Sequence, residues 1–288
     1  MKDLPTSPRI AQIKRNRKVG RIRLIILLII LFISIIVGLS YLSFDRRISI
    51  KDVVVNGTSI ISWNEVSDKI EENLSGKYIF IFSKRNSFIY PHDKIMSSLM
   101  TEFPRIEKLD ISVKNFDTLV LNIKERLGKY LYCGAALPDK KEEVGENCYF
   151  VNNDGYIFDK APYFSGDIYF KYYTEITGDK NKALGSQVFG PDRFHKIARF
   201  VDEVAKLGFK PIYLVKGGDN VYYIYLKTQN DKPNPKIMFK EDNDLDTIFD
   251  NLETAMKEKE FANEINSKYE TLSYIDLRFK NKVLYKFQ

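Results

Sequence analysis

The longest apolar run in the chain lies close to its N-terminus. Leu24–Phe44 holds 21 residues without a charged side chain, and about 20 such residues let a helix cross a hydrocarbon core of about 30 Å. A soluble helix is rarely apolar on every face over this length. Since no later run approaches it, the pattern predicts one transmembrane helix over Leu24–Phe44.

The flanks of this run predict its orientation. Eight basic residues and one acid precede it, while Asp45–Ile60 has three basic residues. The positive-inside bias places the N-terminus in the cytoplasm and the rest of the chain outside. A cleaved signal peptide is the alternative, with Gly38–Ser40 as a weak cleavage site. The run exceeds the 7–15 residues of a signal core, which favours an uncleaved anchor.

The pattern after the anchor alternates between strand and helix periods. A β-rich run over Ile48–Asn56 ends at an Asn-Gly turn signal. Trp63, Val66, Ile70 and Leu74 recur at helical spacing, which predicts a helix over Trp63–Leu74 with Ser62 and Glu65 as a capping box. Further elements follow, namely an extended Tyr78–Phe82, a helix from Pro91 to Phe103, and strands Ile106–Lys114 and Leu119–Ile123.

The remaining chain reads mainly as short strands. Two amphipathic helices interrupt them, over Asp192–Leu207 and Asp244–Asn263. Strands are predicted at Tyr130–Cys133, Cys148–Val151, Ile157–Phe158, Asp167–Thr174, Ile212–Val215, Val221–Leu226, Lys236–Phe239, Leu272–Phe279 and Val283–Phe287. The last two form a terminal hairpin.

The net positive charge of the chain comes from its N-terminal tail. The 288 residues carry +7 overall, but eight of the 45 basic and one of the 38 acidic residues precede the apolar run. That leaves 37 residues of each sign after Phe44. Because the external part is neutral, it offers no basic field for phosphates, and we expect no nucleic-acid partner.

The first external block resembles a POTRA domain, and more closely that of the bacterial division proteins FtsQ and DivIB. Its predicted order is strand, helix, helix, strand, strand, just outside a membrane anchor. The resemblance rests on short motifs in series, namely Val53-x-Val55-x-Gly57, Ile61-Ser62-x-x-Glu65-Val66, Gly76-Lys77-x-Ile79-Phe80, Phe103-Pro104-x-Ile106 and Leu119-x-Leu121-x-Ile123-x-Glu125-Arg126. Most of these apolar positions also suit a core, and Gly57 suits a turn.

The second block resembles the β domain that follows POTRA in this family. Its most specific element is Tyr274–Phe279, similar to the family's Tyr-hydrophobic-Asp-Leu-Arg-aromatic strand. Val151–Phe158 and Ile176–Gly178 resemble two of its turns. The resemblance implies an α+β chain, with a basic tail (1–23), a transmembrane helix (24–44), a POTRA domain (45–126) and a mostly antiparallel β domain with two helices (127–288).

Two cysteines are placed to form a bridge. Cys133 and Cys148 flank a charged loop outside the membrane, where disulfides persist. We predict that they are joined, the alternative being two reduced thiols. The two histidines, His92 and His195, fall in different predicted helices and domains, so we expect no metal site.

Catalytic motifs are not found in the sequence. It lacks the sequence motifs of catalytic nucleophiles, zinc sites and phosphate-binding loops by which many enzymes are recognised. We therefore expect no enzyme activity, cofactor or small-molecule substrate. Asp276 and Arg278 would share a strand face as an ion pair of little energy if exposed. A partner site remains possible there, since the family strand lies near its binding edge.

The hypothesis is therefore a non-enzymatic scaffold. A terminal strand can accept a strand from another chain, and the resemblance implies small bitopic partners of the FtsB/DivIC and FtsL types. The residues carried over are Phe279, Val283, Tyr285 and Phe287, with Lys282 and Lys286 as guards against other pairings. The alternative is an ordinary edge strand that binds no partner and whose lysines prevent pairing with other chains.

The resemblance places the protein in the cell (inner) membrane at the division septum. Two other functions stay open. One is a membrane-anchored extracytoplasmic enzyme with an unrecognised site. The other is a POTRA-type polypeptide-transport component, which would be expected to carry tandem copies or a barrel.

Overall fold

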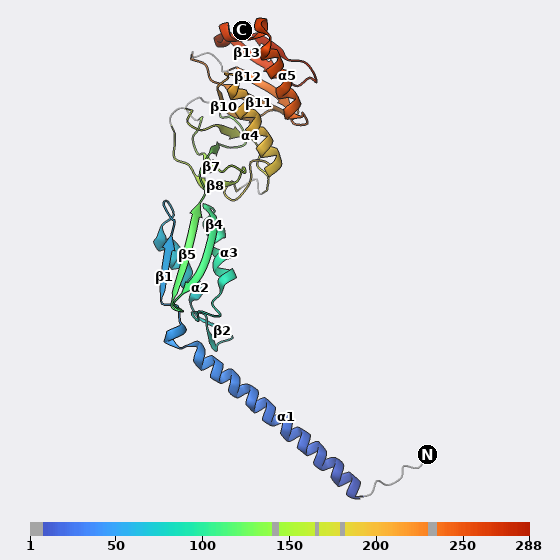
Figure 1. Cartoon of the computed structure of the whole chain (residues 1–288). Coiled ribbons are helices and arrows are strands. Elements are labelled where there is room, and N and C mark those ends of the chain that lie inside the picture. Colours follow the sequence, from blue (N-terminus) through green and yellow to red (C-terminus); the bar gives the residue numbers. More distant parts are fainter. Residues whose placement is uncertain (1–7, 140–143, 165–166, 179–181, 230–234) are drawn as a thin grey trace, which may run out of the picture. The chain divides into compact units, whose positions relative to one another are not determined.

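The structure is a computed structural model, shown in Figure 1, that describes residues 8–139, 144–164, 167–178, 182–229 and 235–288. The chain divides into two compact units, Met1–Lys124 and Glu125–Gln288. A long apolar helix and small sheets belong to the first unit, and a nine-stranded sheet with helices belongs to the second. The predicted α+β class is confirmed.

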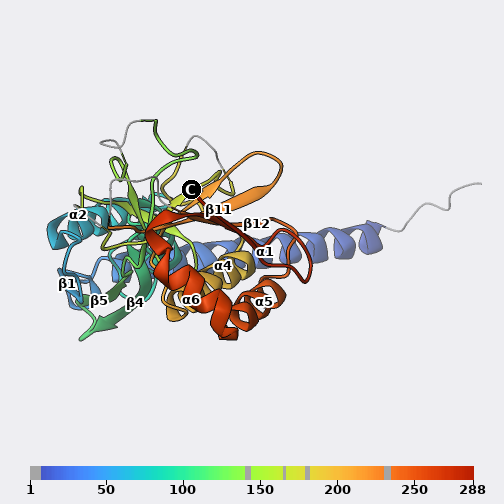
Figure 2. The ribbon, with the colours of Figure 1, turned by 90° about the horizontal axis from the view of Figure 1, so that it is seen from above.

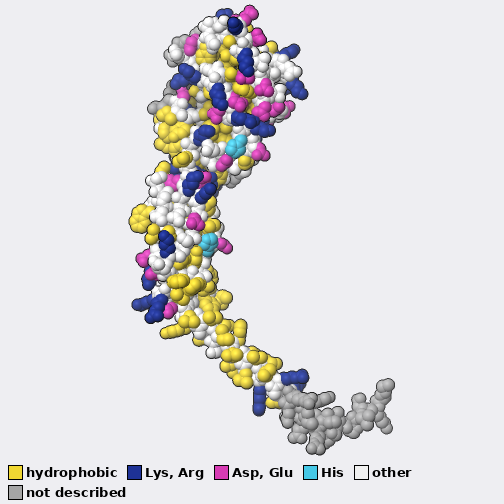
Figure 3. Space-filling view, in the orientation of Figure 1, with side chains coloured by type: hydrophobic (Ala, Val, Ile, Leu, Met, Phe, Trp, Pro, Cys, Tyr) yellow, Lys and Arg dark blue, Asp and Glu magenta, His cyan; other side chains and the backbone are white. Residues whose placement is uncertain are grey.

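Helix α1 (Pro8–Ser43) is longer than the apolar run that predicted it. It begins 16 residues before Leu24, in the basic tail, because Lys, Arg and Gln are good helix formers that extend a helix already started. Its Lys18–Ser43 part has the length and apolar composition of a membrane anchor or a signal sequence. Most of its described side chains are exposed, and Figure 3 shows the apolar ones along the helix.

The first unit combines a three-stranded sheet with two helices. After a short 3-10 turn, its elements are β1 (Asp52–Asn56), α2 (Trp63–Leu74), β2 (Lys77–Tyr78), β3 (Phe82–Ser83), α3 (His92–Glu102), β4 (Ile106–Lys114) and β5 (Thr118–Glu125). The sheet order is β1-β5-β4, with β1 parallel to β5. Val66 and Ile70 of α2 and Ile95 and Leu99 of α3 are fully buried in the core beside the sheet.

Two local predictions in this unit were wrong, while the helix over Trp63–Leu74 is confirmed. Trp63 itself is 59% exposed, because the buried stripe of α2 starts one turn later at Val66. Ser62 occupies the N-cap position without a side-chain hydrogen bond, so the capping box does not form. Tyr78–Phe82 is not one extended run, because Ile79 and Phe80 have left-handed φ angles of 47° and 66° and turn the chain into a β2–β3 hairpin.

The second unit is built on one large mixed sheet. Its elements are β6 (Tyr130–Tyr132), β7 (Tyr149–Val151), β8 (Ile157–Lys160), β9 (Lys171–Tyr173), α4 (Pro191–Lys206), β10 (Pro211–Lys216), β11 (Val221–Leu226), β12 (Lys236–Lys240), α5 (Leu245–Lys257), α6 (Lys259–Ser267), β13 (Leu272–Asp276) and β14 (Leu284–Phe287). The strand order is β14-β13-β12-β11-β10-β9-β6-β7-β8. Five neighbouring pairs are antiparallel and three are parallel. Crossovers through α4 and through α5 and α6 make β9–β10 and β12–β13 parallel, and the segment that contains β7 and β8 connects the parallel pair β6–β9.

Helices α4, α5 and α6 pack on one face of this sheet and lie side by side in Figure 2. The helix predicted over Asp244–Asn263 is in fact two helices, so the described part of the unit has three α-helices. Glu258 is extended, with φ −71° and ψ 118°, in a stretch of charged residues with no apolar side chain to hold the helix against the sheet. The break re-aims the chain so that Ile265 of α6 is also fully buried.

Candidate partner-binding edge

Strand β14 forms one end of the nine-stranded sheet. It pairs with β13 in antiparallel register, Ile275 opposite Tyr285 and Asp276 opposite Leu284. No strand in the described part of the chain pairs with its other side. An edge of this kind presents backbone N–H and C=O groups to another chain.

The backbone direction along β14 follows from one hydrogen bond. The Gln288 N–H donates to the Thr271 carbonyl oxygen at 2.8 Å, so position 288 faces β13. Backbone groups of an antiparallel strand alternate in direction, so Leu284 and Lys286 also face β13. The N–H and C=O groups of Tyr285 and Phe287 therefore point away from the sheet.

The side chains of β14 hold it against helix α6. The Tyr285 hydroxyl donates to the Glu264 carboxylate at 2.6 Å, and its ring lies 5.1 Å from that of Phe261, edge-on. The hydrogen bond from Tyr285, followed by that from Lys268, lowers the pKa of Glu264. The Lys268 ammonium also lies 5.3 Å from the Phe287 ring centre.

The opposite side of β14 is open. Side chains alternate across a strand, so Leu284 and Lys286 lie on the face away from α6, and Leu284 is 45% exposed. The hydrophobic pattern Val283, Tyr285, Phe287 did not single out Leu284. Only the register with Asp276 shows that it borders the edge on the uncovered face.

Three of the four predicted contact residues come together at this edge, and the fourth does not. Val283 and Phe287 pack at the border of the core, and Tyr285 lies between them. Phe279 lies in the turn before β14, half exposed, with the Arg278 guanidinium 5.9 Å from its ring centre. The predicted strand Leu272–Phe279 ends at Asp276.

That early end has a local cause. The buried Asp276 carboxylate accepts the Arg278 backbone N–H at 3.0 Å and the Arg278 side-chain Nε and Nη2 at 2.9 and 2.7 Å. These bonds bend the chain within two residues. They are also the first cause of the raised pKa of Arg278. The predicted ion pair is therefore a buried-carboxylate turn rather than an exposed pair on a strand face.

The other end of the sheet is not equivalent. At β8, the Ile157 N–H donates to Ser186 O and the Ile157 carbonyl accepts from Gly185 N, both at 2.9 Å. A segment of the same chain therefore already occupies the start of that edge. Among the described residues, β14 is the end strand with its outer side open.

A disulfide closes the β6–β7 connection. Cys133 and Cys148 are bonded, with Cα atoms 4.2 Å apart. Cys148 is buried, and both cysteines pack with Leu131 and Phe150 in a small apolar cluster. Part of the charged loop between them, residues 140–143, lies outside the described residues.

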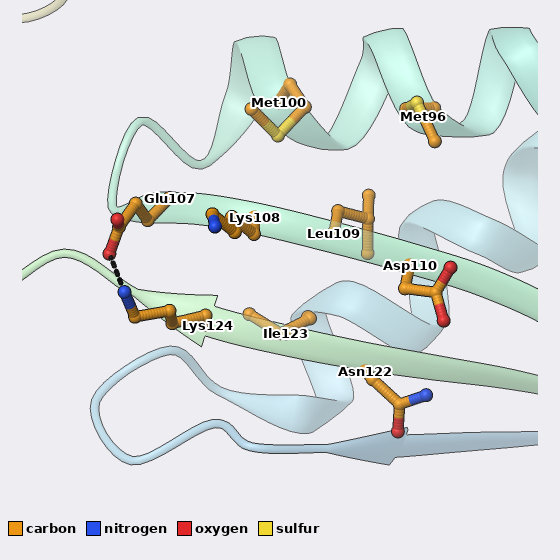
Figure 4. A pocket seen from close by; sticks show the side chains of 9 residues that line it. All are labelled: Met96, Met100, Glu107, Lys108, Leu109, Asp110, Asn122, Ile123 and Lys124. Carbon is orange, nitrogen blue, oxygen red and sulfur yellow. Dashed lines mark ion pairs between the residues drawn. The ribbon is translucent and has the colours of Figure 1, made fainter.

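The first unit has a surface groove, which is shown in Figure 4. It is a shallow groove of about 540 Å³ between α3 and the strands β4 and β5, with Met96 and Met100 on the helix side. The Glu107–Lys124 ion pair at 2.9 Å closes one end of it. No serine, cysteine or histidine is among the described residues that line it.

The histidines lie apart, as their sequence positions suggested. His92 Nδ1 is 2.9 Å from Asp93, and His195 Nε2 is 3.3 Å from Asp154 in the other unit. Within the described residues, no three His, Cys, Asp or Glu side chains are grouped to hold a metal.

No protein-family model matches the sequence, and no curated protein matches it.

Proposed function

We propose that this chain is a non-enzymatic scaffold of the bacterial division machinery, similar to FtsQ and DivIB. In this proposal α1 is an uncleaved anchor with its basic end in the cytoplasm. The first unit is a POTRA domain that helps localisation to the septum. The second is the β domain that receives small bitopic partners of the FtsB/DivIC and FtsL types.

The element order supports the POTRA assignment. One strand, two helices and two strands follow the apolar helix. The three-stranded sheet has β1 at one end, paired with β5. The β2–β3 hairpin is an addition between the two helices. The apolar stripes of both helices are buried in one core with the strands, as expected of a single folded domain.

The observation that carries the proposal is the open edge of β14. The outward backbone groups of Tyr285 and Phe287 can hydrogen-bond a partner strand, which extends the sheet by one. Leu284 is exposed beside the edge and provides apolar contact with the partner strand. The charge of the exposed Lys286 discriminates between partner strands. The other end strand, β8, already uses the corresponding groups of Ile157.

A proline at position 285 tests this mechanism. Tyr285→Pro removes one outward N–H without removing a β13–β14 hydrogen bond, and edge strands tolerate proline on their outer side. Tyr285→Ala is the matched control, because it removes the same side chain and keeps the N–H. Losing one interfacial hydrogen bond and leaving its partner unsatisfied costs about 1–3 kcal/mol, which corresponds to about 5- to 150-fold in affinity.

The measurement is co-purification of the full chain with co-expressed FtsB/DivIC-type and FtsL-type proteins. We expect Tyr285→Ala to retain the partners and Tyr285→Pro to lose them, with both variants folded by circular dichroism. Equal capture by the two variants would exclude strand addition at β14. Deleting Lys280–Gln288 is a coarser test, because it uncovers the core beneath Phe287 and makes β13 a new edge.

A further inference from the structure

The β2–β3 hairpin presents apolar side chains where a water-facing turn would normally be polar. Ile79 is 80% exposed and Phe80 is 90% exposed. Both have left-handed φ angles, which residues other than glycine, asparagine and aspartate rarely adopt. The turn therefore directs two large apolar side chains outward, and core packing does not explain them.

This hairpin is bonded to the last turn of α1. Ser40 Oγ donates to the Ile81 carbonyl at 2.5 Å, and the Ser83 N–H donates to Ser43 Oγ at 3.2 Å. The Asn86 side-chain amide donates to the Ser43 carbonyl at 3.3 Å. Since Ser40 lies inside the apolar run Leu24–Phe44, the hairpin tip is level with the end of that run.

The surroundings of the hairpin have the composition of a membrane interface. The Lys77 ammonium lies 5.0 Å from the Phe44 ring centre, and the Lys84 ammonium lies 6.0 Å from that of Tyr78. Tyr41, on the adjoining turn of α1, is 84% exposed. Aromatic rings and lysines with apolar stems are the residues that occupy the headgroup level.

We propose that the β2–β3 hairpin is a second membrane contact, with Ile79 and Phe80 inserted among the acyl chains of the outer leaflet of the bilayer that α1 spans. This inference rests on the proposed function, because it requires α1 to remain as an uncleaved anchor. The occupant is lipid because the hairpin is continuous with an apolar helix whose described side chains are mostly exposed (Figure 3). Two attachments fix the tilt of the first unit on the membrane, which one helix would leave free.

The chain offers a built-in reference for depth. Trp63 is its single tryptophan and is itself exposed. It follows β1, whose five residues extend about 17 Å away from the segment that joins α1. A tryptophan at position 80 and the native one at position 63 are therefore exposed aromatic reporters at opposite ends of the same unit.

The experiment compares two full-length proteins in phosphatidylcholine vesicles with and without bromine on the acyl chains. One is the native chain, which reports from Trp63. The other is Trp63→Phe/Phe80→Trp, which reports from position 80. Flotation with the vesicles first shows that α1 is inserted, which is the part that belongs to the proposed function.

We expect the reporter at position 80 to have blue-shifted emission and to lose most of it in brominated vesicles, while Trp63 loses little. If the chain floats and the reporter at position 80 is not quenched, the hairpin contact is wrong and the anchor stands. Equal quenching of both reporters also overturns it, because the contact would not be specific to the hairpin. If the chain does not float, the anchor fails, and the hairpin contact fails with it.

Discussion

The hydroxyl of Tyr285 and the carboxylate of Glu264 form a 2.6 Å hydrogen bond that joins the last strand to helix α6. The two residues are 21 positions apart, and their bond lies at the surface. Among the described residues, no strand pairs with the outer side of β14. The Tyr285–Glu264 bond therefore adds a side-chain contact to the backbone pairing with β13 that holds this edge in place.

Replacing Tyr285 with phenylalanine tests this dependence. Tyr285→Phe removes the hydroxyl and keeps the ring against Phe261, so we expect faster amide hydrogen exchange over Leu284–Phe287. The thermal midpoint should change little, because an exposed hydrogen bond contributes little to global stability, while local opening is sensitive to it. Hydrogen exchange followed by mass spectrometry measures the effect.

Tyr274→Phe is the matched control for that variant. Tyr274 lies on the neighbouring strand opposite Lys286, on the face away from α6. Its loss of a hydroxyl should leave exchange in β14 unchanged. Equal acceleration in both variants, or in neither, would contradict a specific role for the Tyr285–Glu264 bond.

Gly57 and Gly76 allow backbone strain to be separated from close approach. Both have φ of +83°, but a Cβ atom at Gly57 would lie 2.1 Å from the Ile123 carbonyl oxygen, whereas at Gly76 the nearest contact is the Lys84 ammonium at 3.8 Å. Gly76→Ala should cost about 1–2 kcal/mol from the left-handed conformation alone. Gly57→Ala should cost clearly more, because β5 must also move.

Denaturant unfolding of the full chain in detergent measures both glycine variants side by side. The difference between them isolates the clash with Ile123. Equal destabilisation would show that β5 yields at no cost and that Gly57 is needed for its conformation only.

The sequence predicted elements well where one local period decided them. The helix over Trp63–Leu74 and the strand Ile106–Lys114 have the predicted bounds, since each buries one regular stripe. Prediction failed where a contact outside the hydrophobic repeat ended the element early, whether with a distant part of the fold or between residues two positions apart. Glu258 breaks a helix so that Ile265 can pack, and Asp276 ends a strand by binding Arg278.

The candidate edge could be predicted as a strand but not as an edge. Alternation placed Val283, Tyr285 and Phe287 on one strand. Tyr285 and Phe287 lie on β14, whereas Val283 precedes its first residue, Leu284. Strand order is a property of the whole sheet, however, and three parallel pairings inserted by crossovers leave no signal in the local pattern. Which side of β14 stays open, and that Leu284 borders it, required the register.

The Cys133–Cys148 bond should stabilise the second unit measurably. It closes a loop of 15 residues, for which the chain-entropy account gives about 3 kcal/mol. Cys133→Ser/Cys148→Ser should therefore unfold at lower denaturant concentration than the native chain. A reductant should lower the stability of the native chain alone, because the variant has no cysteine left. A reductant effect of equal size on both proteins would contradict this account.

Tyr173 should make the second unit sensitive to alkali. Burial raises the pKa of its hydroxyl to about 12, and the hydrogen bond it accepts from the Gly145 N–H at 3.0 Å offsets this only in part. In the unfolded chain a tyrosine titrates near 10. The unfolded state then releases its proton first as pH rises, so stability is complete below about pH 10 and falls towards pH 12.

The expected slope for such a tyrosine is at most about 1.4 kcal/mol per pH unit inside that window. Tyr222, whose pKa burial also raises to about 12, adds a similar slope. Tyr173→Phe should remove the contribution of Tyr173, so its unfolding free energy should fall less steeply with pH than that of the native chain. Denaturant unfolding across the window, with tyrosinate absorbance to follow ionisation, measures both quantities. Parallel pH profiles for the two proteins would show that Tyr173 ionises without opening the fold, and would contradict the burial-based argument.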